Sequence, residues 1–233
     1  MQRLHRSLAQ SRRDDLVRKI RGRGKKASNI WYVFAAGSRS NVVLLGDLRF
    51  ELFLATEGDP DVDDAEYNPK PITVALGDTR YEVGFDAIVR RCDGQRECRD
   101  VHETSIFGGE TGDSLEFSLK KVASQAIGAA YREFTLPDLD RLQQRTRNWA
   151  RAIAALARCR HVELAPEEHA VALSLADGAM HSLGALIQAF DQMQPAHVIA
   201  AAVSLLRKRA IRSDLDTHRW GLRTQLWQEA NQR

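Results

Sequence analysis

The chain has 233 residues, of which 43% are hydrophobic and 28% are charged, and its formal net charge is +3. This composition is typical of one or two globular domains with a buried core, and the low Gly and Pro content excludes fibrous and low-complexity proteins. No apolar run approaches the roughly 18 residues that a membrane-spanning helix needs, and the first 20 residues are polar and basic rather than a secretory signal. We therefore expect a cytoplasmic protein that makes no membrane contact.

The charge is distributed unevenly along the chain. Residues 1–26 hold ten basic and two acidic residues, a net charge of +8, and residues 27–120 hold nine basic and eighteen acidic residues, a net charge of −9. Residues 121–233 hold fifteen basic and eleven acidic residues, a net charge of +4. Basic ends around an acidic middle fit a protein that binds a polyanion and whose central carboxylates hold a divalent metal. A basic tail beside an acidic surface explains the same numbers, so charge alone leaves both interpretations open.

The first segment, residues 1–26, contains too few apolar residues to fold alone, and we predict a flexible basic arm. Arms of this composition commonly neutralise phosphates, although a nuclear-targeting or expression-related basic tail has the same composition. The candidate phosphate contacts at the end of the arm are Arg21, Arg23, Lys25 and Lys26.

A mixture of helix and strand patterns follows the arm. Apolar residues at helical spacing predict a helix over 41–57, capped by Ser40 or Asn41 and ended by the Gly58-Asp59-Pro60 cluster. Three later runs predict strands over 72–76, 81–89 and 97–102, and Asp93-Gly94 between the last two is typical of a hairpin turn. A helix, then strands joined by short turns, then more helices favours an α+β fold with a mixed sheet and flanking helices.

A long helix is predicted over 138–159. We place the end of the first domain after this helix, so that the domain covers residues 27–160. Beyond it we predict three helices, over 166–176, 182–190 and 195–208. Ser182 is the expected N-cap of the second helix, and Pro195 occupies the first position of the third. A short hairpin of 210–215 and 218–222 is expected to follow. Three helices followed by a β-ribbon describe a winged helix-turn-helix domain over 161–233.

Basic residues gather at the end of the third helix of this second domain and in the hairpin after it. Such residues contact DNA in many winged helices, but others dock proteins, and basic side chains are also favoured at helix C-termini by the helix dipole. The candidate DNA contacts are Arg207, Lys208, Arg209, Arg212 and Arg219.

The acidic middle contains a set of residues suited to metal-dependent phosphodiester cleavage. Asp86 lies in or at the end of one strand, and the return strand of the predicted hairpin carries Asp100 and His102, which project to the same face because they are two residues apart. Carboxylates that converge on Mg²⁺, with a proton-handling group beside them, are the requirement of this chemistry. The arrangement resembles that of PD-(D/E)XK nucleases. By contrast, we expect Glu57, Asp61 and Glu103 to be solvated surface residues.

Several segments resemble the TnsA-like endonuclease subunits of heteromeric transposases. The resemblance spans roughly Val42 to Glu103 and rests on Asp59-Pro60-Asp61-Val62, on Pro71-Ile72-Thr73-Val74, and on Phe85-Asp86-Ala87-Ile88-Val89-Arg90-Arg91 with Asp93-Gly94. It implies a restriction-endonuclease-like fold that cleaves the non-transferred strand at transposon ends with Mg²⁺, for which Mn²⁺ can substitute. The implied partners are double-stranded DNA, a DDE-type transposase and an AAA+ regulator, in the bacterial cytoplasm at the nucleoid.

The same resemblance implies roles for individual residues. Asp86 corresponds to the central metal ligand, Asp100 stands where the family has Glu or Gln, and His102 stands where it has Lys. Counting back from Asp59 places Arg49 at the expected position of the family's helix glutamate. Asp47 and Glu51 lie two residues to either side and share a helix face, and we favour Glu51 as the helix acid. The predicted metal ligands are therefore Glu51, Asp86 and Asp100, and His102 completes the catalytic set.

Three functions remain open at this point. The first is a Mg²⁺-dependent DNA endonuclease within a transposase complex. The second is a catalytically degenerate subunit that binds and bridges DNA in the same complex, since three of the four site positions depart from the family pattern. The third is a transcriptional regulator that uses the winged helix alone.

Overall fold

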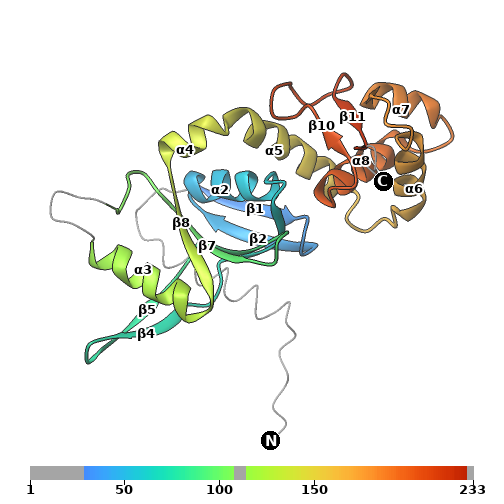
Figure 1. Cartoon of the computed structure of the whole chain (residues 1–233). Helices are drawn as coiled ribbons and strands as arrows, with labels where there is room; N and C mark the ends of the chain where they lie inside the picture. Colours follow the sequence, from blue (N-terminus) through green and yellow to red (C-terminus); the bar gives the residue numbers. More distant parts are fainter. Residues whose placement is uncertain (1–28, 108–113, 230–233) are drawn as a thin grey trace, which may run out of the picture.

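The structure is a computed structural model that describes residues 29–107 and 114–229 (Figure 1). Its central sheet has the strand order β3-β6-β7-β8. The strands are β3 (Val62–Tyr67), β6 (Ala87–Arg91), β7 (Arg96–His102) and β8 (Ala129–Thr135). β6 is antiparallel to both of its neighbours, whereas β8 is parallel to β7. Because a parallel pair needs a crossover, the chain passes through helix α3 (Leu115–Ala126) between them. The predicted α+β class, with a mixed sheet and flanking helices, is confirmed.

The predicted helix over 41–57 is wrong in its first part. Residues Ser40–Leu45 form strand β2, which pairs with β1 (Ile30–Ala35), and helix α2 covers only Asp47–Glu57. Two β-branched residues, Val42 and Val43, favour the strand, and Gly46 separates the two elements with a φ of 96°. A left-handed backbone of this kind is easily adopted only by glycine.

The predicted strand over 81–89 is also divided. Strand β4 (Ile72–Leu76) pairs with β5 (Thr79–Val83), and β6 then starts at Ala87. The segment between β5 and β6 is held by the backbone of β7, since the amide of Asp86 donates to the carbonyl of Arg99 at 3.1 Å. The turn at Asp93-Gly94 is confirmed, because β6 and β7 form an antiparallel hairpin around it.

Two helices replace the predicted single helix over 138–159. They are α4 (Leu136–Arg141) and α5 (Gln143–Arg158), with a break at Leu142. The first begins earlier than predicted because Thr135 and Asp138 form a capping box at its N-terminus.

The C-terminal part contains helices α6 (Ala165–Ser174), α7 (Leu183–Ala189) and α8 (Pro195–Arg207). A small antiparallel sheet accompanies them, with the order β10-β11-β9 and the strands β9 (His181–Ser182), β10 (Arg212–Ser213) and β11 (Gln225–Trp227). The N-cap role of Ser182 is confirmed, since its hydroxyl accepts a hydrogen bond from the amide of Ala185. Pro195 occupies the first position of α8, as predicted.

The predicted return strand over 218–222 is wrong, because β10 pairs instead with β11. The buried side chain of Asn148 in α5 organises the intervening loop. Its amide nitrogen donates to the carbonyls of Leu215 and His218, and its oxygen accepts from the amide of Trp220. A side chain some 70 positions earlier in the chain thus satisfies backbone groups that a strand would otherwise pair.

Helix α8 joins the two parts of the molecule. One apolar cluster packs Val203 of α8 against Phe53 of α2 and Ile153 of α5, and a second packs Val198 of α8 against α6 and α7. The predicted boundary near residue 160 therefore lies within a continuous core. None of the described helices is both long enough and apolar enough to cross a bilayer.

A buried ion pair adds to this junction. Arg207 of α8 donates to Glu57 of α2 at 3.2 Å and to the carbonyl of Val62 at 2.6 Å. Tyr67 and the amide of Ala36 also donate to the Glu57 carboxylate. The expectation that Glu57 lies on the surface is wrong, because its side chain is only 1% exposed.

Candidate functional site: a cleft beside Asp86 and Asp100

The two central aspartates of the predicted site lie side by side. Asp86 directly precedes β6, and Asp100 lies near the end of β7. The amide of Asp86 donates to Asp100 Oδ1 at 2.9 Å, and the amide of Val101 donates to Asp86 Oδ2 at 3.0 Å. The antiparallel hairpin brings the residues together, and these backbone donors fix both carboxylates in position.

A basic side chain pairs with each aspartate. Arg49 Nε of α2 lies 2.6 Å from Asp86 Oδ1, and Lys120 Nζ of α3 lies 2.6 Å from Asp100 Oδ2. Lys120 also donates to the carbonyl of Gly84 at 2.7 Å and lies 5.1 Å from the ring centroid of Phe85. Sequence reasoning missed Lys120, since its position opposite Asp100 depends on how α3 packs against the sheet.

Burial controls the electrostatics of Asp100. Its side chain is only 3% exposed, and this burial raises the pKa of Asp100 to about 6. The positive charge of Lys120 opposes the rise, whereas the nearby Asp86 adds to it. Asp100 is thus a carboxylate that is held charged mainly by one lysine.

The other two predicted site residues occupy different surroundings. His102 lines the same cleft, and its buried Nε2 has no hydrogen-bond partner among the described residues. Glu51 is exposed and lies outside the cleft lining, with the carboxylates of Asp140 and Asp47 near enough to raise its pKa, after the larger effect of partial burial. The residue of α2 that reaches Asp86 is therefore Arg49 and not the predicted Glu51.

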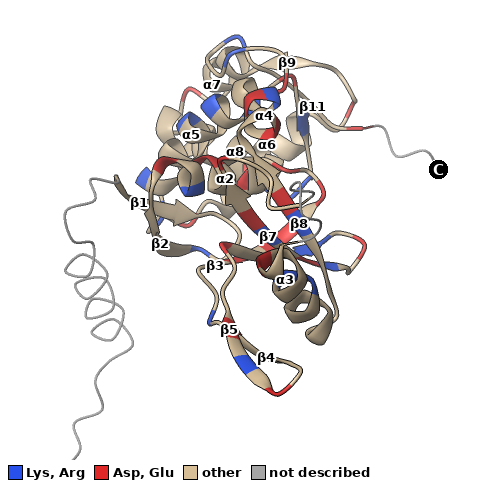
Figure 2. Ribbon diagram, turned by 90° about the vertical axis from the view of Figure 1, so that its left-hand side faces the viewer, with Lys and Arg blue, Asp and Glu red and all other residues tan. Residues whose placement is uncertain are grey.

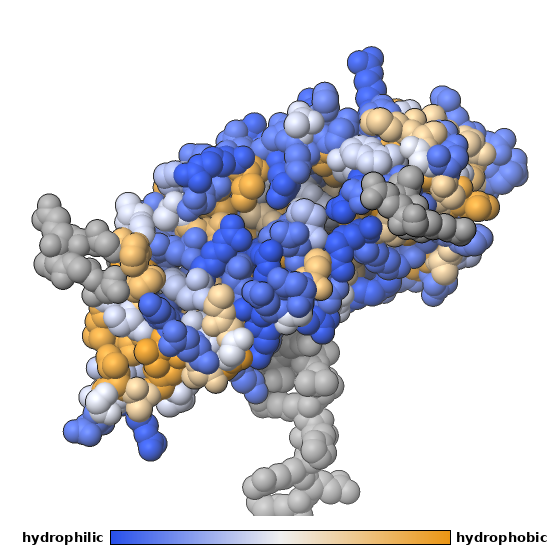
Figure 3. All heavy atoms as spheres, in the orientation of Figure 1, coloured by the Kyte–Doolittle hydropathy of each residue, from blue (hydrophilic) through white to orange (hydrophobic). Residues whose placement is uncertain are grey.

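The cleft beside these residues has a volume of about 610 Å³. Its rim is partly apolar, because Leu115 at the start of α3 is 56% exposed. Figure 3 shows hydrophobic side chains gathered over this end of the molecule, around α3 and the β4–β5 hairpin. The titratable residues of the lining are Arg49, Glu82, Asp86, Asp100, His102, Glu116 and Lys120.

The arrangement does not fit a bound Mg²⁺. All four carboxylate oxygens of Asp86 and Asp100 already face a protein partner, namely Arg49, Lys120 and two backbone amides. Mg²⁺ prefers carboxylate oxygens with near-octahedral geometry, and the two basic side chains neutralise the charge that attracts it. Within 29–107 and 114–229, no group of three or more His, Cys, Asp or Glu side chains is placed to hold a metal ion.

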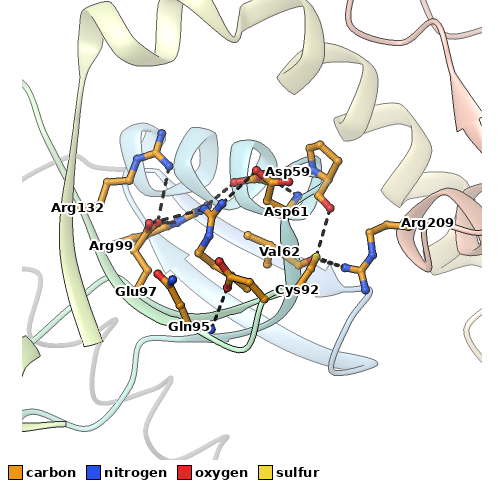
Figure 4. A network of polar contacts seen from close by, with 12 residues as sticks. Asp59, Asp61, Val62, Cys92, Gln95, Glu97, Arg99, Arg132 and Arg209 are labelled. Carbon is orange, nitrogen blue, oxygen red and sulfur yellow. Dashed lines mark hydrogen bonds and ion pairs between the residues drawn. The ribbon is translucent and has the colours of Figure 1, made fainter. Parts of the chain in front are cut away.

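A second charged cluster lies on the opposite face of β7 (Figure 4). Arg99 is fully buried and donates to Glu97 at 2.5 Å, to Asp59 at 2.8 Å and to Thr56 at 3.2 Å. Asp59 belongs to the motif that carries the family resemblance. Its contact with Arg99 ties the end of α2 to the sheet, which is a structural reason for an acid at this position.

Most of the predicted DNA contacts in the C-terminal part make ion pairs within the chain. Arg207 is buried at the junction with α2, and Arg209 contacts Asp63 and Cys92. Lys208 and Arg212 pair with Glu168 and Glu229 on the surface, and Arg219 is exposed. The four basic residues predicted in the arm, Arg21, Arg23, Lys25 and Lys26, lie outside the described residues.

A basic face on α5 was not predicted from the sequence. Arg147, Arg151 and Arg158 are exposed and lie on one side of this helix, opposite the buried Trp149 and Ile153. Among the residues that the structure describes, no acidic side chain pairs with these three arginines. The helix contains no Asp or Glu, and Figure 2 shows its basic positions apart from the acidic ones near β3 and β7. This face could have been recognised in the sequence, because the helix carries four arginines and no acidic residue.

The chain matches no protein-family model and no curated protein.

Proposed function

We propose that the protein is a double-stranded-DNA-binding subunit of a DNA-processing complex and that its nuclease-like cleft does not bind metal. The observation that carries the proposal is the arginine face of α5. Solvated helices usually mix charges of both signs, so an exposed helix face with only arginines fits an anionic partner. Since α5 packs on both α2 and α8, this face spans the junction between the two parts of the molecule.

The order of the elements supports the same proposal. Apart from the β4–β5 hairpin inserted between β3 and β6, the chain passes from helix α2 through the antiparallel strands β3, β6 and β7 to helix α3 and the parallel strand β8. This order is compatible with a restriction-endonuclease-like core. The order α6, β9, α7, α8, β10 and β11 is compatible with a winged helix, which remains part of the proposal. Transposition, with a DDE-type transposase and an AAA+ regulator as partners, is proposed on the resemblance in sequence motifs alone.

The test measures the affinity of the full chain for a double-stranded DNA fragment by fluorescence anisotropy at several salt concentrations. Each arginine that contacts a phosphate contributes about 0.9 to the slope of log K against log salt. The double variant Arg147→Gln/Arg151→Gln is therefore expected to weaken binding and to lower the slope by about 2.

The matched control removes two exposed positive charges elsewhere, in Lys70→Gln/Arg80→Gln. It is expected to leave both the affinity and the slope close to the wild-type values. Equal losses in the two double variants would show that net charge alone governs binding, and the α5 face would then have no special role.

A second candidate function is the Mg²⁺-dependent endonuclease that the sequence predicts. One observation favours it, namely that Asp86, Asp100 and Lys120 converge beside an open cleft. A nicking assay on DNA that carries the transposon ends, with the partner proteins present, separates the two candidates. Nicking that disappears in Asp86→Ala while DNA binding persists would establish the endonuclease and contradict the proposed non-cleaving role.

A further inference from the structure

Asp86, Asp100, Arg49 and Lys120 form a cluster of two ion pairs in the cleft, and Arg49 is its accessible member. Its side chain is 44% exposed, whereas those of Lys120, Asp86 and Asp100 are 13%, 11% and 3% exposed. Its Nε lies 2.6 Å from Asp86 Oδ1, on the side of the carboxylate that the amide of Val101 leaves open. The guanidinium therefore occupies the position from which a solvated cation would approach Asp86.

The charges of the cluster balance without any further ion. Two carboxylates face one arginine and one lysine, and each of the four oxygens lies against a backbone amide or one of these basic side chains. A divalent cation that entered this site would add two positive charges beside two basic side chains in a partly buried environment, where such repulsion is strong. Binding would therefore require the displacement of at least one of the two basic groups.

We infer that Arg49 takes the place of a divalent metal and excludes Mg²⁺ and Mn²⁺ from the Asp86–Asp100 pair. Arg49, rather than Lys120, determines whether a cation can bind, because Lys120 is also held by the carbonyl of Gly84 and by the ring of Phe85. An acidic residue at position 49 would reverse the charge beside Asp86 and supply a third carboxylate. Three carboxylates form the kind of oxygen-rich site that Mg²⁺ and Mn²⁺ prefer.

This inference rests on the non-cleaving role proposed for the cleft, but it does not depend on DNA binding by α5. The two proposals fail in different measurements. Loss of the α5 effect on DNA affinity would leave the metal exclusion intact. Metal binding by the wild type would contradict the metal-free cleft but would leave DNA binding by the α5 face intact.

The experiment titrates the full-length protein with Mn²⁺ alone at pH 7.5 and measures free Mn²⁺ by electron paramagnetic resonance. Arg49→Glu is expected to bind one Mn²⁺ at least about tenfold more tightly than the wild type. Adding Asp86→Asn to Arg49→Glu should remove that site. The control Arg223→Glu reverses one exposed charge in the C-terminal part and should bind Mn²⁺ like the wild type.

Two results would overturn the inference. One is a wild-type Mn²⁺ site as tight as that of Arg49→Glu and abolished by Asp86→Asn. The other is a folded Arg49→Glu protein, with an unchanged circular dichroism spectrum, that gains no site. Should Arg49→Glu fail to fold, Arg49→Met takes its place and is expected to show a smaller gain in affinity, since it removes the competing charge without adding a ligand; no gain there would equally overturn the inference.

Discussion

Adjacent residues of β7, Arg99 and Asp100, belong to two charged clusters on opposite faces of the sheet. Arg99 is 0% exposed and is enclosed by Glu97, Asp59 and Thr56. Asp100 is almost as buried, but its cluster ends in Arg49, which is 44% exposed and lines a cleft of about 610 Å³. Both clusters pair carboxylates with basic side chains, but the central arginine of the first is enclosed, whereas Arg49 in the second is exposed to solvent.

The difference shows that charge pairing alone does not identify a functional site. The Arg99 cluster joins the end of α2 to β7, and its cost in desolvation is offset by several simultaneous contacts. The Asp100 cluster has the same chemistry, but a solute that enters the cleft can displace one of its basic side chains, Arg49. Access, rather than the number of charges, separates the site from the structural network, and the following predictions test this distinction.

The largest effect is expected when the enclosed cluster is broken. Arg99→Met removes the nearest basic partner of the buried Glu97 and of the half-buried Asp59, and removal of one member of a buried ion pair typically costs about 3–5 kcal/mol of unfolding free energy. Urea denaturation measures this loss. Arg132→Met is the control, since Arg132 is 47% exposed and approaches Glu97 only at 3.9 Å, and it should change stability by less than about 1 kcal/mol. Similar losses in the two variants would contradict the structural role of Arg99.

An effect of intermediate size concerns the pH dependence of Asp100. Its pKa is raised from 3.8 to about 6 in the folded protein, so the folded state binds the proton more tightly than the unfolded state does. The stability that this proton provides is present below pH 4 and is lost as the pH rises towards 6, by about 3 kcal/mol. Relative to Asp100→Asn, the wild type should therefore become less stable between pH 4 and pH 7.

Urea denaturation of both proteins across this pH range measures the effect. The difference in unfolding free energy between them cancels the other titrating groups. Curves that remain parallel from pH 4 to pH 7 would show that Asp100 is not in the buried environment that the structure describes.

The smallest effect is expected at the open end of the cleft. The Arg49–Asp86 ion pair is partly solvated, and pairs of this kind contribute up to about 1 kcal/mol. Arg49→Met should accordingly change the unfolding free energy by no more than that amount, which thermal denaturation can measure. A loss as large as that of Arg99→Met would mean that Arg49 is a structural residue and would remove the contrast between the two clusters.

The sequence was sufficient to predict the central pair of aspartates. Asp86 and Asp100 flank one hairpin turn, and the strong local signal at Asp93-Gly94 fixes which residues lie opposite one another. Ser182 and Pro195 were equally predictable, because helix N-termini depend on nearby residues. The mixed sheet followed from the order of these local elements.

Features that depend on tertiary contacts were not predictable in this way. The cation of Asp100 comes from Lys120 on another element, and the loop after β10 is shaped by Asn148 in α5. Glu57 was assigned to the surface because acidic residues are rarely buried, and its partner Arg207 is 150 positions away. The choice between Arg49 and Glu51 required the rotation of α2, which depends on where β2 ends.

The most direct measurement of metal exclusion is a crystal structure of the wild-type protein soaked in Mn²⁺, with anomalous scattering recorded for the metal. The expected result is that Arg49 remains on Asp86 and that no anomalous peak lies between Asp86 and Asp100. A Mn²⁺ peak coordinated by both aspartates, with Arg49 displaced into the cleft, would contradict the conclusion that this arginine takes the place of the metal.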